Sequence, residues 1–473
     1  MKLESLAGKN VLVVGALGKT GQAMTALLTK VGCIVYGLDQ NLTASNSIQG
    51  LNIFDSNNLS ESFQTTQIAT VFVSPGVPLS QNVFQEARNL NLPILGDLDL
   101  GYLYWLESNH TKPAIVAITG TDGKSTTTAL IAHLLREADF KALECGNFGL
   151  PFSSAVFEST DVLVCECSSY QLEELHYFRP NVALILNIAA DHLDRYASMA
   201  AYVSSKLNLF KNQDKHFDRS IIGMGVKSVC ETLQLSVSAD RVIEEISSQA
   251  TLNNFSLDWS EFSLNSETNR KNATLALATI QDLISISQNQ NSQLSTKLIA
   301  NLGLHEVQRK IIEGLRNFRG LPHRQEYVTQ KEGIIFINDS KATTVHSVLS
   351  ALQSIQDKQV YLLIGGLDKN LDFSVFGDLQ KLTGLKLYPF GRAAEKIVSQ
   401  VIAVNHDDKE LKPYSNLEDA FYAALRDAKR NTKYLFNQNQ TDSVILLSPA
   451  CASQDAYKDY KERGEHFRSL SLS

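Results

Sequence analysis

The sequence predicts an α/β protein of three domains, and three observations support this prediction. Short apolar runs rich in β-branched residues alternate with helix-like stretches, a pattern that favours mostly parallel sheets. The chain has 473 residues, and at roughly 150 residues per domain this length corresponds to about three domains. A polar stretch near residue 110 and a Gly-Leu-Pro turn at 320–322 mark the boundaries. We therefore expect domains at 1–110, 111–319 and 320–473.

The composition is that of an ordinary folded protein. Apolar residues make up 44% and charged residues 20%, which excludes a disordered or fibrous chain. A net charge of −7 gives no general attraction to nucleic acid or to anionic lipid, so neither is expected as a partner. No apolar run approaches the roughly 18 residues of a membrane-spanning helix. The first residues also lack a signal-peptide pattern, so we expect a cytoplasmic protein.

The six cysteines are scattered along the chain. Cys165 and Cys167 alternate at the end of an apolar run, which predicts that they share one face of a strand. A disulfide framework or a zinc site is therefore not expected, and a reducing compartment fits this cysteine usage best.

The first domain opens with a βαβ pattern. An apolar run at 10–14, a helix-like stretch at 22–31 and a second run at 33–38 make up the unit, and further strands are expected at 71–73 and 93–95. The loop Gly15–Gly21 follows the first strand, and Asp39 lies about 20 residues beyond it, as in dinucleotide-binding folds. This loop can be a second phosphate loop, a loose dinucleotide fingerprint or a plain turn. Our functional interpretation is a site for a nucleotide diphosphate without redox chemistry.

The second domain carries the most informative motif. A buried-strand pattern at 114–118 leads into Gly120-Thr121-Asp122-Gly123-Lys124-Ser125-Thr126, and a helix is expected over 126–138. Glycines let backbone N–H groups curl around an anion at a helix start. Lys124 can reach the β- and γ-phosphates of a nucleotide, and Ser125 can hold Mg²⁺. Ile118 stands where the usual phosphate loop has glycine, so this loop is a shortened variant.

Three further sites in this domain allow two interpretations each. Glu166 follows the strand 162–165 and is either a Mg²⁺ ligand or part of a surface turn. Asp191 and His192 follow the strand 182–186 and either hold a second metal ion or have only a structural role, with the histidine as a packed or capping residue. Lys206, in the helix-like stretch 202–211, is either a solvated lysine or a metal ligand. An ammonium group cannot bind a cation, so the second interpretation requires conversion to an anion such as a carbamate.

The third domain places basic and polar clusters after its predicted strands at 334–337, 360–364 and 444–447. Such clusters at strand ends suit phosphates and carboxylates. The clusters, together with one that precedes the first of these strands, are Leu321–Glu326, Asn338–Thr343, Gly365–Lys369 and Ser448–Ser453.

Taken together, these motifs resemble the Mur ligase family, the ATP-dependent amino-acid ligases of peptidoglycan precursor synthesis. Within that family they are most similar to the ligases that add D-glutamate, and the resemblance spans essentially the whole chain. The segments that carry it are Gly120–Thr128, Gly146–Pro151, Glu166–Gln171, Asp191–Tyr196, Leu321–Arg324, Asn338–Thr343 and Ser448–Ser453.

The resemblance implies a fold and an activity. The fold is a Rossmann-like N-terminal domain, a P-loop-type central ATPase and a Rossmann-like C-terminal domain. The activity is the ADP-forming addition of D-glutamate to UDP-N-acetylmuramoyl-L-alanine through an acyl phosphate. ATP, two Mg²⁺ ions and a carbamylated lysine are implied, in a protein that is a monomer.

The resemblance also implies roles for individual residues. Catalysis would involve Lys124, Asn147, His192 and Lys206. ATP would contact Gly120 to Thr126, Asn272, Arg324 and Asp339. The metal ions would be held by Ser125, Glu166, His192 and carbamylated Lys206. The UDP group would lie near Lys19, Thr20, Asp39, Gly76 and Asn147. D-Glutamate would be received by His323, Lys341, Thr343, Lys369, Ser453 and Tyr460.

The sequence departs from the family pattern at three places. Asp122 stands where asparagine is usual, which adds a negative charge near the phosphates. The stretch Lys271–Leu275 keeps Asn272 but lacks the usual histidine and second asparagine, which affects the expected adenine contacts. Tyr170 replaces a common phenylalanine.

Other functions remain open from the sequence. A folylpolyglutamate synthase or another Mur ligase can share the nucleotide loop, although the first-domain loop and Ser448–Ser453 disfavour the former. The Asp-Asn-Pro-Arg motif of the diaminopimelate- or lysine-adding ligases does not occur. A nucleotide-dependent switch would leave Glu166, His192 and Lys206 without a shared purpose. A dinucleotide oxidoreductase is the third alternative.

Overall fold

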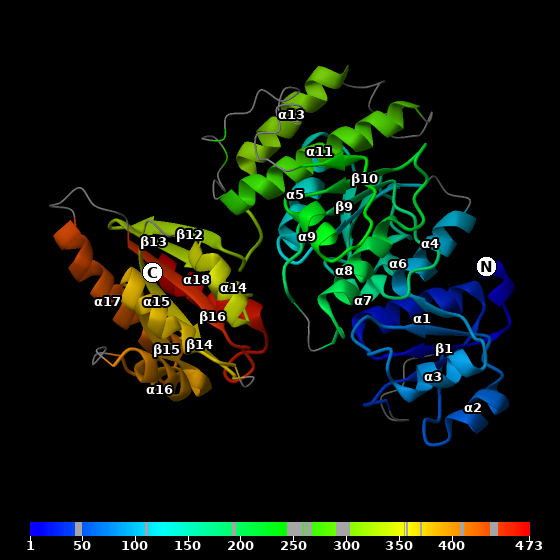
Figure 1. Ribbon diagram of the computed structural model, residues 1–473, viewed down its shortest axis with the longest axis horizontal. Coiled ribbons are helices and arrows are strands. Elements are labelled where there is room, and N and C mark those ends of the chain that lie inside the picture. The colour runs from blue at the N-terminus through cyan, green and yellow to red at the C-terminus, as the bar shows by residue number, and fades with distance from the viewer. Residues whose placement is uncertain are drawn as a thin grey trace. The chain divides into compact units, whose positions relative to one another are not determined.

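The computed structural model describes residues 1–42, 50–108, 112–191, 195–243, 259, 262, 267–289, 303–353, 355, 358–368, 371–406, 411–435 and 443–473. The chain divides into two compact units, Met1–Phe318 and Arg319–Ser473 (Figure 1). Within the described residues there are three sheets, two in the first unit and one in the second. Strands alternate with helices and pair mostly in parallel, so the predicted α/β class is confirmed.

The N-terminal sheet of the first unit is parallel, in the order β3-β2-β1-β4-β5. Side chains alternate between its faces: Val11 and Val13 of β1 pack with helices α1 and α4, whereas Leu12 and Val14 pack with α2 and α3. The strands are β1 Asn10–Val14, β2 Ile34–Leu38, β3 Leu51–Ile53, β4 Thr70–Val73 and β5 Ile94–Gly96. The helices are η1 Leu3–Leu6, α1 Lys19–Val31, α2 Leu59–Thr66, α3 Asn82–Asn89 and α4 Asp97–Glu107.

The central sheet of the first unit is also parallel, in the order β11-β10-β9-β6-β8-β7. Helix α5 follows the middle strand β6 and packs against α11 and α13. The strands are β6 Ala114–Thr119, β7 Ala142–Gly146, β8 Val162–Glu166, β9 Val182–Ile185, β10 Arg219–Ile222 and β11 Arg241–Val242. The helices are α5 Lys124–Glu137, α6 Phe152–Ala155, α7 Ser169–Leu172, α8 Met199–Leu207, η3 Asn208–Phe210, α9 Val226–Thr232, α11 Glu267–Asn289 and α13 Gly303–Asn317.

Helix α4 joins the two sheets of the first unit. Its Leu100 and Leu103 pack in the core of the N-terminal sheet, whereas Leu98 and Tyr102 pack in the core of the central sheet. Two buried carboxylates lie in its first turn. Asp97 accepts hydrogen bonds from the N–H groups of Phe152 and Ser153, at 2.8 and 3.1 Å. Asp99 accepts from three consecutive N–H groups, those of residues 176–178.

The sheet of the second unit has the order β12-β13-β16-β14-β15, in which only β12 pairs antiparallel within the described residues. Helices cover both faces: α14 to α16 share one core with Leu362, and α17 and α18 share the other with Leu363. The strands are β12 Glu326–Lys331, β13 Ile334–Asn338, β14 Gln359–Gly365, β15 Lys386–Phe390 and β16 Ser443–Ala450. The helices are α14 Val345–Gln353, α15 Val375–Thr383, η5 Gly391–Ala393, α16 Ala394–Val404, α17 Leu417–Leu435 and α18 Tyr460–Leu472.

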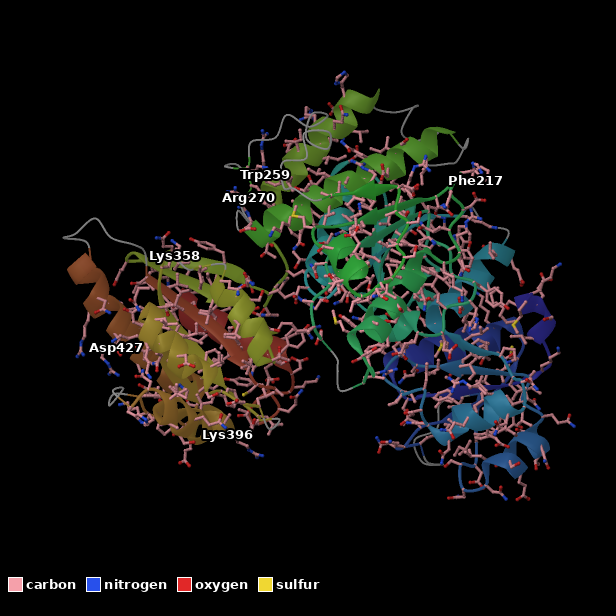
Figure 2. All side chains as sticks on the ribbon, in the orientation of Figure 1. Phe217, Trp259, Arg270, Lys358, Lys396 and Asp427 are labelled. Carbon is pink, nitrogen blue, oxygen red and sulfur yellow. The ribbon has the colours of Figure 1, made fainter. Side chains whose placement is uncertain are left out.

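Polar contacts fasten the helices of the second unit to its strands. The Tyr388 hydroxyl of β15 donates to Asp427 of α17 over 2.8 Å. Lys396 of α16 donates to Asp368, in the loop after β14, over 2.7 Å. Figure 2 labels Asp427 and Lys396 on these helices.

Two smaller predictions can be compared with the structure. All six cysteines lie in described residues as buried thiols without disulfides, and the Sγ atoms of Cys165 and Cys167 are 3.8 Å apart, which confirms their shared face. In the part of the chain that the structure describes, none of the helices combines the length and apolar character needed to span a bilayer.

Candidate active site

The phosphate loop connects β6 to α5 at the edge where the strands of the central sheet end. Gly120 and Gly123 have φ values of +157° and +79°, conformations that glycine adopts at low cost. The N–H groups of Thr121 and Asp122 donate to Oδ1 of Asn187, at 3.2 and 2.9 Å, and the Asn187 amide returns a hydrogen bond to Asp122 O. Asn187 therefore holds the first half of the loop. The N–H groups at the start of α5 provide the positive end of the helix dipole for an anion.

Two lysines converge on this loop. Lys124 Nζ donates to the carbonyls of Gly120 and Thr121, at 2.9 and 2.7 Å. Lys206 Nζ donates to the same Gly120 carbonyl, at 2.7 Å, and lies 4.6 Å from the centre of the Tyr202 ring. Lys206 is 1% exposed. Burial, and then the positive charge of Lys124, lower its pKa to about 7. The interpretation of Lys206 as a solvated lysine is therefore wrong.

A buried carboxylate lies next to the loop. Glu166 is the last residue of β8 and is 2% exposed. Its Oε2 accepts from the Ser125 hydroxyl over 2.5 Å, and its Oε1 accepts from the Asn147 amide over 2.6 Å. The interpretation of Glu166 as part of a surface turn is excluded by this burial. Oxygen ligands from a carboxylate and a hydroxyl at a phosphate loop are those that Mg²⁺ prefers.

Other predicted residues of the central sheet lie close to this cluster or outside the described residues. Asn272 of α11 is buried against the loop: a methyl group built on Gly123 would lie 2.7 Å from Asn272 Oδ1. The main-chain N–H of Asp122 donates to Asn187, and Asp122 itself is exposed. Thr126 is half-buried in α5. His192 lies outside the described residues, and among the described ones there is no cluster of three His, Cys, Asp or Glu able to hold a metal ion.

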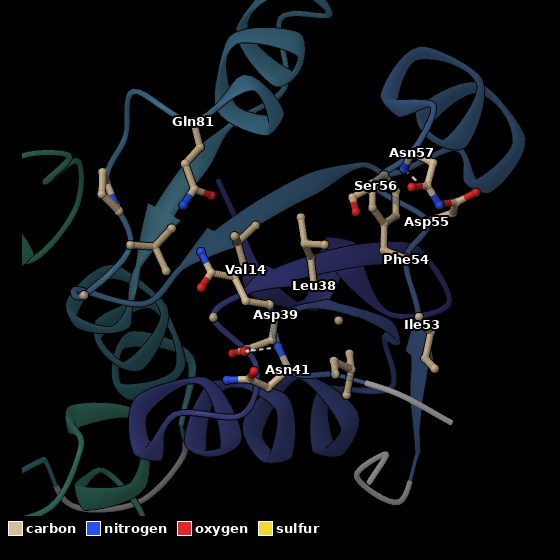
Figure 3. Close-up of a pocket in the computed structure, with 17 residues that line it drawn as sticks. Val14, Leu38, Asp39, Asn41, Ile53, Phe54, Asp55, Ser56, Asn57 and Gln81 are labelled. Carbon is tan, nitrogen blue, oxygen red and sulfur yellow. Dashed lines mark hydrogen bonds between the residues drawn. The ribbon is translucent and has the colours of Figure 1, made fainter. Parts of the chain in front are cut away.

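The N-terminal sheet has a pocket of about 810 Å³ at the ends of its strands. Asp39 follows β2 and Gln81 precedes α3, and both line this pocket together with Gly76 (Figure 3). The Asp39 carboxylate also accepts from the N–H of Leu17 over 3.2 Å, which ties it to the loop before α1.

Lys19 and Thr20 do not line this pocket in the structure. Lys19 Nζ instead donates to the carbonyl of Gly149 over 2.6 Å. Gly149 belongs to the same turn as Asn147, which donates to Glu166. This contact therefore links the N-terminal loop to the surroundings of the phosphate loop.

In the second unit, Asp339 lies at the end of β13 and is 7% exposed. Its carboxylate accepts from the Ser448 hydroxyl at 2.8 Å and from the N–H of Gln325 at 3.2 Å. Burial raises the pKa of Asp339 to about 7, although the hydrogen bonds and the nearby positive charge of Arg324 act in the opposite direction. Arg324 is thus near enough for its charge to act on Asp339, as expected if both residues belong to one site.

His323, Lys341 and Tyr460 form a second cluster in this unit. His323 Nδ1 lies 2.9 Å from the Asn338 amide nitrogen, and its ring lies edge-on to Tyr460. Lys341 Nζ lies 4.5 Å from the centre of the Tyr460 ring. His323 is 5% exposed, so its described contacts are internal to the unit.

The remaining predicted residues of this unit have simpler positions. Ser453 is buried after β16, and its carbonyl accepts from the N–H of Tyr457 over 2.9 Å. Thr343 is half-buried. Lys369 lies outside the described residues.

Sequence reasoning missed four residues that organise these sites. Asn187 clamps the phosphate loop, and Asp97 with Asp99 fastens α4. Arg463 of α18 is 0% exposed and donates to several loop carbonyls. Asn187 stood at a predicted strand end, which was a usable signal, whereas nothing in the sequence separates Arg463 from an exposed helix residue.

A buried strand, a glycine-rich phosphate loop and a carboxylate at the end of the adjacent strand define a nucleotide-dependent enzyme of the phosphate-loop class. The Mur ligase middle domain matches residues 118–299. UDP-N-acetylmuramoylalanine--D-glutamate ligase of Caldicellulosiruptor bescii is 32% identical over 98% of this chain and 97% of its own length. The enzyme of the same name from Aquifex aeolicus is 32% identical over 97% of both chains. The chain therefore belongs to the Mur ligase family, whose members are ATP-dependent, ADP-forming ligases.

The fold is also similar to that of a solved structure with low sequence identity. Mycobacterium tuberculosis folylpolyglutamate synthase complexed with ADP superposes with a TM-score of 0.53. The two proteins are 13% identical over 79% of this chain and 92% of that one. At this identity the similarity concerns the fold alone.

Proposed function

We propose that this enzyme joins D-glutamate to UDP-N-acetylmuramoyl-L-alanine at the expense of ATP. The observation that carries the proposal is the buried Glu166, hydrogen-bonded to Ser125 and Asn147 beside the phosphate loop. It is supported by relatives that carry this activity in their names over nearly the whole chain.

The reaction runs in two steps. The carboxylate of the UDP-linked substrate attacks the γ-phosphorus of ATP, ADP leaves, and an acyl phosphate forms. The amine of D-glutamate then attacks the acyl carbon, loses a proton, and expels inorganic phosphate. Lys124 and the N–H groups at the start of α5 neutralise the charge of the transferred phosphoryl group. The phosphate loop orients the reactants.

Mg²⁺ fits the donor set on the central sheet. Ser125 and Glu166 present a hydroxyl and a carboxylate in a buried position, and the neutral partners of Glu166 leave its charge to be balanced by a cation. When bound, Mg²⁺ would polarise the phosphate oxygens. We assign Ser125 and Glu166 to metal binding, and His192 to a second ion on family resemblance.

Lys206 suits carbamylation because burial favours its neutral amine, which is the form that reacts with CO₂. Carbamylation would convert this neutral amine into an anion with loss of a proton to water, and the anion would pair with Lys124 and offer oxygen ligands to Mg²⁺.

The pocket beside Asp39 suits the uridine part of the first substrate, because its polar lining lies at strand ends in a βαβ fold. We assign Asp39 and Gly76 to this group. Lys19, Thr20 and Asn147 are assigned to the phosphates and the reacting end, since Lys19 reaches the turn that contains Asn147.

The second unit is assigned to the nucleotide and the amino acid. Arg324 and Asp339 would bind the nucleotide. His323, Lys341, Thr343, Lys369, Ser453 and Tyr460 would bind D-glutamate. We further propose that domains at 1–110, 111–319 and 320–473 perform these separate tasks in a cytoplasmic monomer.

The proposal is tested by measuring phosphate release from ATP in the presence of Mg²⁺, with one reactant omitted at a time. Release that requires both UDP-N-acetylmuramoyl-L-alanine and an amino acid supports a ligase. Release without the amino acid supports a nucleotide-dependent switch, and release with a folate substrate and L-glutamate supports a folylpolyglutamate synthase. Either of the last two results would overturn the proposal.

A further inference from the structure

A buried guanidinium lies among the loops at the strand ends of the second unit. Arg463 of α18 is 0% exposed, and it is among the largest fully buried side chains described. Its Nη2 donates to the carbonyls of Ser340 and Cys451, at 2.9 and 3.1 Å. Its Nη1 donates to Ala452 O at 3.2 Å, with a longer contact to Gly365 O at 3.5 Å. These acceptors are neutral.

The acceptors lie at the ends of three different strands or directly after them. Ser340 follows β13, Gly365 ends β14, and Cys451 with Ala452 follows β16. Three residues assigned above to D-glutamate, Lys341, Thr343 and Ser453, lie in the segments that follow β13 and β16. A fourth, Lys369, follows Gly365 in the sequence. One side chain thus cross-links the three segments that would surround the amino acid.

The contacts also extend to the aromatic residue of the cluster. Arg463 Nε donates to the Ser340 hydroxyl at 3.0 Å, and that hydroxyl donates to Tyr460 O at 2.8 Å. The Tyr460 ring in turn lies beside Lys341. A substitution of Arg463 would therefore alter the position of Lys341 in two ways, through the neighbouring Ser340 and through Tyr460.

The backbone near Arg463 has little freedom. Ala450, directly before Cys451, has a φ of +59°, a conformation that costs a non-glycine residue free energy. A methyl group built on Gly366 would lie 2.3 Å from Ala452 O and 3.0 Å from Arg463 Nη1. Such a conformation persists only where the surroundings impose it, and the guanidinium supplies part of that constraint.

We infer that Arg463 is a positioning residue that sets the affinity for the amino-acid substrate by fixing these three loops. The inference rests on the proposed function. The guanidinium of Arg463 holds its N–H donors in a rigid plane, which suits the cross-linking of several carbonyls. Lysine keeps the charge but cannot reproduce that geometry.

The test is steady-state kinetics of the full chain with Arg463→Lys. Loss of several hydrogen bonds from a charged donor predicts that KM for D-glutamate rises about tenfold or more, whereas KM for ATP and for the UDP-linked substrate stays within about twofold. Arg468→Lys is the matched control: it lies on the same helix, pairs with Glu326 at 3.2 Å and is partly exposed. This control should leave all three KM values unchanged.

Two further variants keep the inference testable if Arg463→Lys does not fold. Ser340→Ala removes one acceptor of the guanidinium and should raise the same KM by a smaller factor. In Arg463→Ala, millimolar guanidinium should lower the KM for D-glutamate again, whereas ammonium should not. A fall in kcat alone, or an equal rise of all three KM values in the folded variants, would overturn the inference.

The failure of the inference differs from the failure of the proposed function. If the wild-type enzyme releases no phosphate with D-glutamate, the proposed function is wrong. If the wild type is active with D-glutamate and the folded variants keep its KM, the positioning role is wrong.

Discussion

The Ser125 hydroxyl donates to Glu166 over 2.5 Å, although the two residues are separated by 41 positions in the sequence. The contact joins the first turn of α5 to the end of β8. Both side chains are buried, so their oxygen atoms form a small enclosed polar site at the end of strand β8. A cation that binds there would lie directly beside the phosphate loop.

Glu166→Gln tests that site. Glutamine can still accept from Asn147 and can donate to Ser125, so the fold should persist with little change in thermal stability. Loss of the negative charge should lower kcat by about 100-fold or more and weaken the dependence of the rate on Mg²⁺. Glu144→Gln is the control, because Glu144 lies on the adjacent strand β7 and pairs with Arg136 at 2.8 Å. Full activity of Glu166→Gln would contradict the metal assignment.

Lys206 should exist as a carbamate in the active enzyme. Its pKa of about 7 leaves a large neutral fraction at neutral pH, whereas an ordinary lysine is almost entirely protonated. Wild-type protein in ¹³C-bicarbonate should give a carbamate NMR signal that Lys206→Arg lacks, and depletion of bicarbonate should lower the rate reversibly. Lys211→Arg serves as the control, since Lys211 lies near the end of the same segment. A rate that does not depend on bicarbonate, with no carbamate signal, would contradict this prediction.

Gly123→Ala should impair nucleotide binding. A methyl group there would approach the buried Asn272 to 2.7 Å. KM for ATP should rise about tenfold or more because the loop and Asn272 must shift. Gly225→Ala separates this contact from backbone strain, because Gly225 has a similar φ of +76° and its added methyl group meets nothing within 4 Å. Both variants should lose about 1–2 kcal/mol of stability. If the two variants had the same KM for ATP, the contact with Asn272 would have no role in nucleotide binding.

Asp339 should make the stability of the second unit depend on pH. Its pKa is about 7 in the folded state and about 3.9 when unfolded. Between pH 4 and 7 the folded state therefore binds more protons, and the free energy of unfolding falls as pH rises, by at most about 1.4 kcal/mol per pH unit. Asp339→Asn should remove this slope in urea unfolding experiments on the full chain. A slope equal to that of the wild type would contradict the assignment.

Much of the fold could be predicted from apolar runs. The strands β1, β6, β8 and β13 lie within a residue of their predicted bounds, because each is a continuous apolar run that ends at a polar or glycine residue. Helix α5 begins at Lys124, two residues before its predicted start. There the phosphate loop, rather than the threonine-rich first turn, determines where the helix begins.

The missed strands lack this signal. Strand β12 reads Glu-Tyr-Val-Thr-Gln-Lys and is an antiparallel edge strand that is only partly buried, so its polar residues resemble a loop. Strand β7 contains Glu144 at its centre and is short. Strands β3, β10, β11 and β15 were also not predicted, and each is only two to five residues long.

The chemistry of the site could be predicted where a functional residue lies just after a predicted strand, as Glu166 and Asp339 do. The partners of these residues could not. Tertiary packing decides that Asn187 clamps the phosphate loop and that Arg463 is buried. A charged residue on a polar helix is otherwise expected to face solvent.

The most direct test of the central claim compares amino acids in the phosphate-release assay, with ATP, Mg²⁺ and UDP-N-acetylmuramoyl-L-alanine all present. D-Glutamate should support release together with one equivalent of the amide product, while L-glutamate and the other amino acids should leave the rate at background. Release with a different amino acid, or with none at all, would contradict the assignment of this enzyme as a D-glutamate ligase.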